Sequence, residues 1–362
     1  MADRELKSIE VEGYASIRSA TVSLGRLNVL IGANGAGKSN FIRVFELLGR
    51  LVEEDLGYFV GLNGGASSLL TSGVARLRLA LHGVAGRYEV ELVPAADDLL
   101  IFGRESLAPR TAKGTALEFP RGGREARLPR HNRRLRPVGL MVDLLRGCRV
   151  YHFHDTSRNA PVKQLVPTAD NLALHNDAGN LAAVLLALSD SDDRADQAAY
   201  RRIVGVIRQV APFFRDFVLR PEKSDRLRLR WRQTDSDAVF SANQMSDGTL
   251  RFICLATLLL HPRLPSLVVL DEPELGLHPY AVVQLAGLLR QASTRSQVLI
   301  ATQSVTLMNQ FELDDLIVVE RVDGASEFVR PDRERLGAWL EEYSLGELWE
   351  KNLIGGRPGG QT

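Results

Sequence analysis

Apolar and polar residues alternate along the N-terminal part of the chain. The alternation covers residues 5–31 and ends in the apolar run Leu27–Ile31. A period of two predicts strands. A glycine-rich turn follows, and over Phe41–Leu51 the apolar residues recur at helical spacing. We therefore expect strands, a tight turn and a helix, in that order.

Shorter alternating stretches fill the region from about residue 68 to residue 130. They are separated by glycines and prolines, and they cover Ala75–Leu81, Tyr88–Val93 and Ala116–Phe119. This pattern predicts an antiparallel β insert. Residues 147–153 then form a run that is typical of a buried strand.

The pattern becomes helical between residues 171 and 214, where apolar side chains share one face at a time. Strict alternation returns over Arg226–Arg232, with Leu227, Leu229 and Trp231 on one side and arginines on the other. This alternation predicts a single strand.

The last third of the chain repeats strand–helix units. Its short β-rich runs are Leu267–Leu270, Val298–Ala301 and Leu316–Val319, and helical stretches separate them. Such repeats predict a sheet with parallel strands, covered by helices. The chain is therefore expected to be an α/β protein.

Composition and charge limit the classes of function. The 362 residues are 45% hydrophobic and 25% charged, as in an ordinary globular protein. A net charge of +1 provides no global field that recruits nucleic acid, so any such binding must come from a local patch. Cys148 and Cys254 lie in apolar runs, which favours buried thiols in a reducing cytosol. The N-terminus lacks a secretory pattern, and the longest apolar run, Phe252–Leu260, is too short to cross a bilayer. We expect a cytoplasmic protein without a membrane partner.

A phosphate-binding pattern lies between the first apolar strand and the first helix. Residues Gly32–Ser39 read G-A-N-G-A-G-K-S, which matches G-x-x-x-x-G-K-S. Glycines let backbone N–H groups wrap phosphate oxygens, and the following helix directs its positive end to the same anion. Lys38 is predicted to reach the β- and γ-phosphates, and Ser39 to ligate Mg²⁺. The alternative is a glycine-rich turn that binds nothing.

A pair of carboxylates follows the run Leu267–Leu270. Asp271 emerges at the C-terminal end of this predicted strand, where open α/β sheets place their ligands. We expect Asp271 to hold the Mg²⁺ hydration shell and Glu272 to orient and polarise an attacking water. The alternative is an acidic helix cap after a buried strand.

Two further motifs complete the set. Ser246-Asp247-Gly248-Thr249 opens the apolar stretch Leu250–Leu260, and Ser246 is predicted to be its N-cap. After the run Val298–Ala301 comes Thr302-Gln303-Ser304. Either motif is weak evidence alone, and their order and spacing give them weight.

In this order, the motifs resemble those of the SMC/RecF/OLD-like branch of ABC ATPases, and especially stand-alone bacterial "AAA family ATPases". They are G-x-N-G-x-G-K-S-N, S-D-G-T, D-E-P-E-x-G-L-H-P and A-T-Q-S. The resemblance implies a P-loop NTPase fold (an ABC-ATPase head) with a mixed central sheet, an antiparallel β insert and a helical lobe. It places residues 1–155 in the first part of the ATPase lobe and 156–245 in the helical lobe and a connecting strand. Residues 246–335 form the signature helix, Walker B and switch half, and 336–362 a C-terminal helix and tail.

The resemblance also assigns roles to single residues. It makes Ser246–Thr249 the signature motif, residues 274–279 the D-loop, and Gln303 the γ-phosphate sensor, which in relatives is often His. Because Gln carries no titratable charge, a fast His-assisted turnover is in doubt. Tyr151–Ser157 takes the place of the Q-loop, so that either His154 or Asp155 contacts the γ-phosphate and Mg²⁺. A satisfied polar turn is the alternative there, and Gln164 is a weaker candidate for the same role.

The complete predicted site serves ATP and Mg²⁺. Its catalytic residues are Glu272, Gln303 and Lys38. Its nucleotide contacts are Asn34, Gly35, Ala36, Gly37, Lys38, Ser39, Asn40, Ser246, Asp247, Gly248 and His154. Its metal contacts are Ser39, Asp271 and Asp155.

The resemblance further implies a head-to-head homodimer that closes on ATP, acts on double-stranded DNA or commands a nuclease or other effector, and serves DNA repair or anti-phage defence. Two groups of arginines bear on the DNA hypothesis, and either could contact phosphates or simply be solvated. They are Arg121, Arg124, Arg127, Arg130, Arg133, Arg134 and Arg136, and Arg226, Arg228, Arg230 and Arg232.

Two other classes of function compete with this interpretation. The ATPase subunit of a membrane transporter would show an L-S-G-G-Q signature and a Q-loop glutamine, whereas this chain has S-D-G-T. A P-loop kinase lacks a signature helix and a D-E-P-E-L-G-L-H-P segment, so it ranks lowest.

Overall fold

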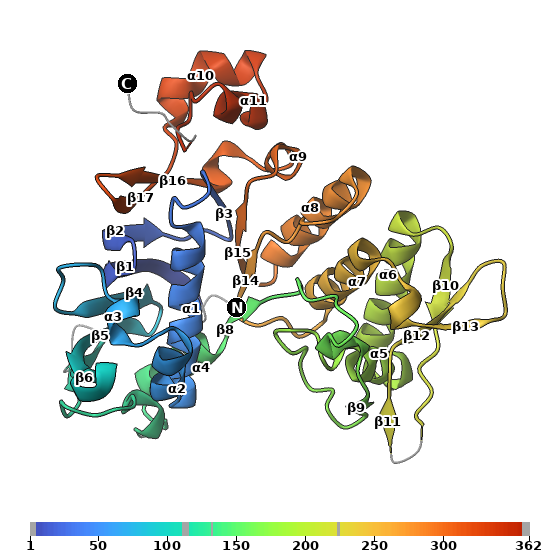
Figure 1. Cartoon of the computed structure of the whole chain (residues 1–362), viewed down its shortest axis with the longest axis horizontal. Helices are drawn as coiled ribbons and strands as arrows, with labels where there is room; N and C mark the ends of the chain where they lie inside the picture. The colour runs from blue at the N-terminus through green and yellow to red at the C-terminus, as the bar shows by residue number, and fades with distance from the viewer. Residues whose placement is uncertain (1–4, 111–115, 132, 223–224, 357–362) are drawn as a thin grey trace. The chain divides into compact units, whose positions relative to one another are not determined.

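A computed structural model of the chain describes residues 5–110, 116–131, 133–222 and 225–356 (Figure 1). These residues form two compact units. The first draws on Met1–Val150, Pro265–Val269 and Ser296–Thr362, and the second on Tyr151–Leu264 and Leu270–Arg295. Each unit has sheets and helices of its own.

The central sheet of the first unit is mixed, as predicted. Its strand order is β17-β16-β3-β15-β14-β8. Strand β3 is parallel to both β15 and β16, whereas β17 is antiparallel to β16. Every residue of β3 and β15 is buried, which explains why both strands are mostly apolar. The strands are β3 (Leu27–Ile31), β8 (Cys148–Tyr151), β14 (Leu267–Asp271), β15 (Gln297–Thr302), β16 (Leu316–Val322) and β17 (Ala325–Val329).

The predicted antiparallel insert is part of a larger sheet, of order β2-β1-β4-β5-β6-β7. The first two strands of the chain join it because β1 pairs with β4, placing Ile9 opposite Leu81 and Val11 opposite Leu79. These four side chains are fully buried and form the inner face. The strands are β1 (Leu6–Tyr14), β2 (Ile17–Ser23), β4 (Leu77–Gly83), β5 (Gly86–Ala95), β6 (Leu99–Pro109) and β7 (Leu117–Glu118).

Helix α1 connects the two sheets of this unit through one core. Its Phe41 and Phe45 belong to the same buried cluster as Leu79 of the antiparallel sheet and Leu30 of the central sheet. This packing fixes the start of α1 at the end of β3. The helices of the unit are α1 (Lys38–Glu53), α2 (Leu56–Leu62), α3 (Ala66–Leu69), α4 (Arg136–Arg146), α9 (Val305–Met308), α10 (Arg333–Glu342) and α11 (Leu345–Glu350).

The second unit contains the predicted helical lobe. Its helices are α5 (Leu181–Asp190), α6 (Arg194–Val210), α7 (Asp247–Leu260) and α8 (Pro279–Ser293). Two small sheets accompany them, of order β10-β12-β13 and β11-β9. Their strands are β9 (Val166–Pro167), β10 (Phe214–Phe217), β11 (Arg226–Leu227), β12 (Arg230–Gln233) and β13 (Val239–Ser241).

The prediction of a single strand over Arg226–Arg232 was wrong. The structure divides this segment into β11, which pairs with β9, and β12, which pairs with β10 and β13. The alternation itself is correct, since Leu227, Leu229 and Trp231 are all at most 1% exposed. Alternation of apolar residues indicates which face of a segment is buried. It does not indicate how many strands pair with that segment.

The two cysteines are buried free thiols, as predicted. Burial raises the pKa of both the Cys148 and the Cys254 thiol to about 12. Within the described ranges, no helix has the length and apolar character needed to cross a membrane.

Candidate functional site

The predicted phosphate loop runs from the end of β3 to the start of α1, and its glycines are required by its shape. Gly32, Gly35 and Gly37 have φ values of 152°, 78° and 115°. A Cβ atom at Gly32 would lie 2.2 Å from the Val319 carbonyl oxygen, and one at Gly37 would lie 2.0 Å from Ser326 Oγ. The loop therefore needs both the left-handed backbone and the missing side chain of glycine.

Lys38 is the first residue of α1 and is only 5% exposed. Its Nζ atom donates hydrogen bonds to the carbonyl oxygens of Gly32 at 2.7 Å and Ala33 at 3.0 Å. The ammonium group thus lies at the loop, at the positive end of a helix of 16 residues. Ser39 follows it with an exposed side chain. A fixed cation and a helix N-terminus together favour a phosphate.

A network of hydrogen-bonded side chains supports the phosphate loop from behind, and it was not predicted from the sequence. Ser326 Oγ, in β17, donates to the Ala36 carbonyl at 2.6 Å and lies 2.7 Å from Ser16 Oγ. Ser16 Oγ also accepts from Asn40 Nδ2 at 2.8 Å. The network joins the chain's first strands, the start of α1 and β17. No sequence signal could reveal it, because Ser16 and Ser326 are 310 residues apart.

Gln303 lies beside the loop. It follows β15, which pairs with β3 so that Thr302 is opposite Ile31, and both strands end at the same edge. Gln303 Nε2 donates to Asn34 Oδ1 at 2.5 Å. Arg321, which sequence reasoning did not identify, donates to the Gly35 carbonyl at 3.2 Å. The structure therefore brings Asn34, Lys38 and Gln303 together in the first unit.

The second unit holds the candidate signature motif at the start of α7. Ser246 is the N-cap, as predicted, and its Oγ accepts from Thr249 N at 3.3 Å. Ser246 and Asp247 are exposed. A Cβ atom at Gly248 would lie 2.5 Å from the Gly276 carbonyl oxygen. Glycine at this position thus lets the helix start approach the turn that follows Asp271 and Glu272.

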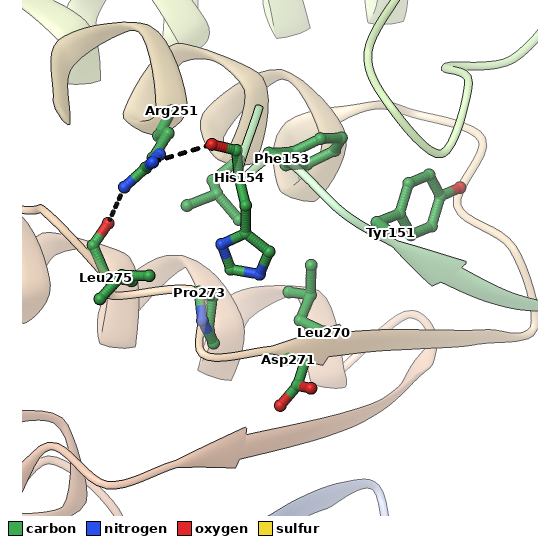
Figure 2. A pocket seen from close by; sticks show the side chains of 9 residues that line it. Tyr151, Phe153, His154, Arg251, Leu270, Asp271, Pro273 and Leu275 are labelled. Atoms are coloured by element: carbon green, nitrogen blue, oxygen red, sulfur yellow. Dashed lines mark hydrogen bonds between the residues drawn. The ribbon is translucent and has the colours of Figure 1, made fainter. Parts of the chain in front are cut away.

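A pocket in the second unit contains two of the predicted residues, His154 and Asp271 (Figure 2). Arg251 of α7 lies at its edge and ties two segments together. Its Nη1 donates to the Leu275 carbonyl and its Nη2 to the His154 carbonyl, both at 2.8 Å. Arg251 was not predicted, since an arginine inside an apolar helix gives no signal of its partners. The pocket is lined by Tyr151, Phe153, His154, Arg251, Leu255, Leu270, Asp271, Pro273 and Leu275.

The other candidates for the Q-loop role lie outside this pocket. Asp155 is exposed and its Oδ1 accepts from Ser157 N at 2.9 Å. Hydrogen bonds to Ser157 lower the pKa of the Asp155 carboxyl. This geometry is the polar turn that the sequence left open as an alternative. Gln164 Nε2 donates to the carbonyls of Arg158 and Ala160, both at 3.5 Å.

Glu272 has a backbone conformation that non-glycine residues rarely adopt. Its φ is 42°, and its carbonyl accepts from Leu275 N at 3.1 Å. The tight turn that follows ends where His278 caps α8, with Nδ1 accepting from Tyr280 N at 3.3 Å. Such backbone strain concentrates at functional sites, because the surrounding structure must hold it in place.

The donor set fits the nucleotide and the metal. The glycine cradle and Lys38 suit a polyphosphate, while the Ser39 hydroxyl and the Asp271 carboxylate are hard oxygen ligands of the kind Mg²⁺ prefers. Among the described residues, no group of three or more His, Cys, Asp and Glu side chains is placed to hold a metal ion alone. A metal held by one or two protein oxygens and by phosphate oxygens is the usual Mg²⁺ arrangement.

Comparisons with known proteins identify a family and a fold for this chain. The sequence model of a family described as "AAA domain, putative AbiEii toxin, Type IV TA system" matches residues 27–94 and 149–309. Both matched segments include motifs described above. No curated protein matches the chain.

Solved structures of SMC head domains have the same fold. One, an SMC head bound to the C-winged helix domain of ScpA, has a TM-score of 0.61 at 14% identity, covering 95% of this chain and 99% of that one. A head domain from Pyrococcus furiosus with an extended coiled coil gives 0.58 at 14% identity, covering 93% and 98%. One from Pyrococcus yayanosii gives 0.57 at 13%, covering 93% and 99%. At these identities the likeness shows the fold alone.

Proposed function

The chain belongs to the AAA-domain family described as "putative AbiEii toxin, Type IV TA system", and from that premise we propose that it is an ATP-hydrolysing dimeric switch. The observation that carries the proposal is the phosphate loop, in which Lys38 Nζ lies 2.7 Å from the Gly32 carbonyl at the start of α1. Only a bound polyphosphate makes use of a buried ammonium, a left-handed glycine loop and a helix N-terminus at one place.

In the first unit, the loop binds and positions the phosphates. Lys38 exchanges its bonds to the loop carbonyls for bonds to phosphate oxygens, while Ser16 and Ser326 keep the loop in shape from behind. Gln303, held by Asn34, hydrogen-bonds the terminal phosphate or a water without changing its charge.

The two carboxylates at the end of β14 serve the hydrolytic step. Ser39 and Asp271 would each offer an oxygen ligand to Mg²⁺, which would neutralise charge at the phosphates. Glu272 orients and polarises the attacking water, and the strained turn at φ 42° fixes the direction of its side chain. His154 lies in the same pocket as Asp271 and takes the Q-loop role. The Asp155 carboxylate instead accepts a hydrogen bond from Ser157 N within its own turn.

Dimerisation completes the site. The exposed Ser246 and the closely packed Gly248 at the positive end of α7 suit a terminal phosphate held by a second copy of the chain. The adjoining turn and helix α8 expose large apolar side chains, with Leu275 at 49%, Tyr280 at 48% and Val283 at 40%. A protein–protein contact would bury these side chains.

The output of the switch is action on DNA or control of an effector protein, in DNA repair or defence. The family description, which names a toxin and a TA system, supports a role in such a module. When the dimer closes on ATP, it presents a two-fold symmetric surface to the DNA or the effector protein. Hydrolysis of the ATP then releases that target.

Steady-state ATP hydrolysis by the purified protein tests the proposal, with K38A as the blank. We expect Mg²⁺-dependent hydrolysis by the wild type and none by K38A. Adding double-stranded DNA at two salt concentrations then separates the outputs, because stimulation that weakens with salt indicates phosphate contacts. Equal hydrolysis by K38A and wild type would refute the assigned site.

A further inference from the structure

The segment that follows β7 is ordered and strongly basic. Over residues 121–131, here called the arginine platform, the exposed side chains include Arg121, Arg124, Arg127 and Arg130, one at every third position. The apolar residues between them point inward, with Ala126 at 1% and Leu128 at 0% exposure.

A buried carboxylate holds the backbone of the platform. Glu105 of β6 is only 1% exposed, and it accepts hydrogen bonds from Arg127 N at 2.8 Å and Leu128 N at 2.9 Å. The Tyr88 hydroxyl donates a third, also at 2.8 Å. Burying a carboxylate is costly unless it is hydrogen-bonded in this way, so Glu105 fixes the segment and leaves the arginine side chains outside.

The single acidic residue of the platform, Glu125, holds a neighbouring helix. Glu125 accepts from Leu56 N at 2.9 Å and Gly57 N at 3.4 Å, so it satisfies the N-terminus of α2. Arg130 pairs with Glu54. Among the described residues, Arg121, Arg124 and Arg127 form neither a side-chain hydrogen bond nor an ion pair.

The second group of arginines is used differently. Arg226 donates to the Leu165 carbonyl at 3.0 Å, and Arg228 and Arg230 pair with Glu222 at 3.5 and 4.0 Å. These side chains fasten the short strands of the second unit. The structure therefore distinguishes two arginine groups that look equivalent in the sequence.

The chemistry of the platform points to one class of partner. An amphipathic membrane-binding helix exposes apolar side chains for insertion, and a protein interface has an apolar centre. Residues 121–131 expose neither, since every exposed non-glycine side chain there is an arginine. Arginine presents planar, paired donors that match phosphate oxygens. We propose that the arginine platform binds the sugar–phosphate backbone of nucleic acid, without regard to base sequence. The inference rests on the proposed function only in naming nucleic acid as the target of the switch.

Fluorescence anisotropy with the full chain and a labelled DNA duplex of about 30 base pairs tests this inference. The variant R121A/R124A/R127A removes three platform charges, and R226A/R228A/R230A removes the same number from the other group as a matched control. We expect the platform variant to lose about tenfold or more in affinity, and its log–log salt slope to fall by roughly 2 to 3, because each phosphate contact contributes about 0.9. The control should bind as the wild type does, and thermal melting checks that both variants fold.

Three outcomes would overturn the inference. They are no duplex binding by the wild type, equal losses in both triple variants, or binding to anionic lipid vesicles in place of DNA. Hydrolysis assays on the same samples separate this inference from the proposed function. Wild type that hydrolyses ATP without binding DNA refutes the platform alone, and K38A that binds DNA normally shows that the platform acts independently of the nucleotide site.

Discussion

At the scale of single residues, phosphate binding depends on how the phosphate loop is held. The sequence motif predicts the loop and its lysine, and the structure adds the residues behind it. Ser326 is 1% exposed and contacts both the Ala36 carbonyl and Ser16. Such contacts could not be predicted, because they join parts of the chain that only the folded sheet brings together.

Replacing Ser326 with alanine should weaken ATP binding more than it weakens the fold. The S326A change leaves the Ala36 carbonyl without its 2.6 Å donor, which costs about 1 kcal/mol of unfolding free energy. We expect a several-fold rise in KM for ATP, since the loop loses its support. Denaturant titration and hydrolysis kinetics measure the two effects, with the exposed Ser19→Ala in β2 as control. An unchanged KM would show that the loop holds its shape without Ser326.

Gln303 should act on turnover. It contacts Asn34 at the loop, and its proposed partner is the terminal phosphate or the attacking water. We expect Q303A to lower kcat about tenfold or more with a smaller change in KM, because the interaction forms mainly in the transition state. Rapid-quench measurement of phosphate release checks this expectation. A rise in KM at constant kcat would make Gln303 a binding residue only.

The cysteine thiols should be unreactive in the folded protein. Burial raises the pKa of both to about 12, whereas an exposed thiol has a pKa of about 8.5. The thiols therefore stabilise the fold fully below about pH 8.5, and this contribution falls as the pH rises toward 12 because only the unfolded chain ionises. A thiol reagent at pH 8 should label the protein only after denaturation. Fast labelling of the native protein would contradict the burial.

At the scale of elements, the patterns of the sequence predicted most of the strands and helices that carry the site. The apolar runs became β3, β14, β15 and β16, and the cap at Ser246 starts α7. Other elements were missed for physical reasons. Helix α4 begins within an arginine-rich segment, and these charges mask the helix's apolar face in the sequence. Strand β6 shows no simple alternation, because its pairing with β5 shifts in register at Gly103.

Replacing either of two glycines tests whether hydrolysis depends on the close approach of α7 to the turn after Glu272. Replacing Gly248 with alanine places a Cβ atom 2.5 Å from the Gly276 carbonyl, so the helix start must move away from the turn. We expect G248A to reduce hydrolysis strongly. A Cβ atom at Gly287 in α8 would meet nothing within 4 Å, so G287A should stabilise the protein by up to about 1 kcal/mol and preserve hydrolysis. Equal activities in the two variants would contradict the coupling of α7 to the turn.

At the scale of the whole molecule, the proposed switch requires two protomers. The first unit holds the phosphate loop and Gln303, while the second exposes Ser246 and the apolar side chains Leu275, Tyr280 and Val283. Sequence motifs indicated a partner only through their resemblance to ABC ATPases, because neither the exposure of a patch nor its neighbours can be predicted from local pattern. The family match and the likeness to SMC heads concern the fold of one protomer, and the dimer is our proposal.

The most direct test of the dimeric switch is the mass of the Glu272→Gln protein in solution, measured by light scattering after gel filtration with and without MgATP. Without its polarising carboxylate the variant should keep its ATP, so its mass should rise from 39.9 kDa to twice that value only when ATP is present. Adding S246A should return it to the monomer, since the contact to the partner's nucleotide is lost. If E272Q binds ATP and still elutes as a monomer, the dimeric switch is wrong.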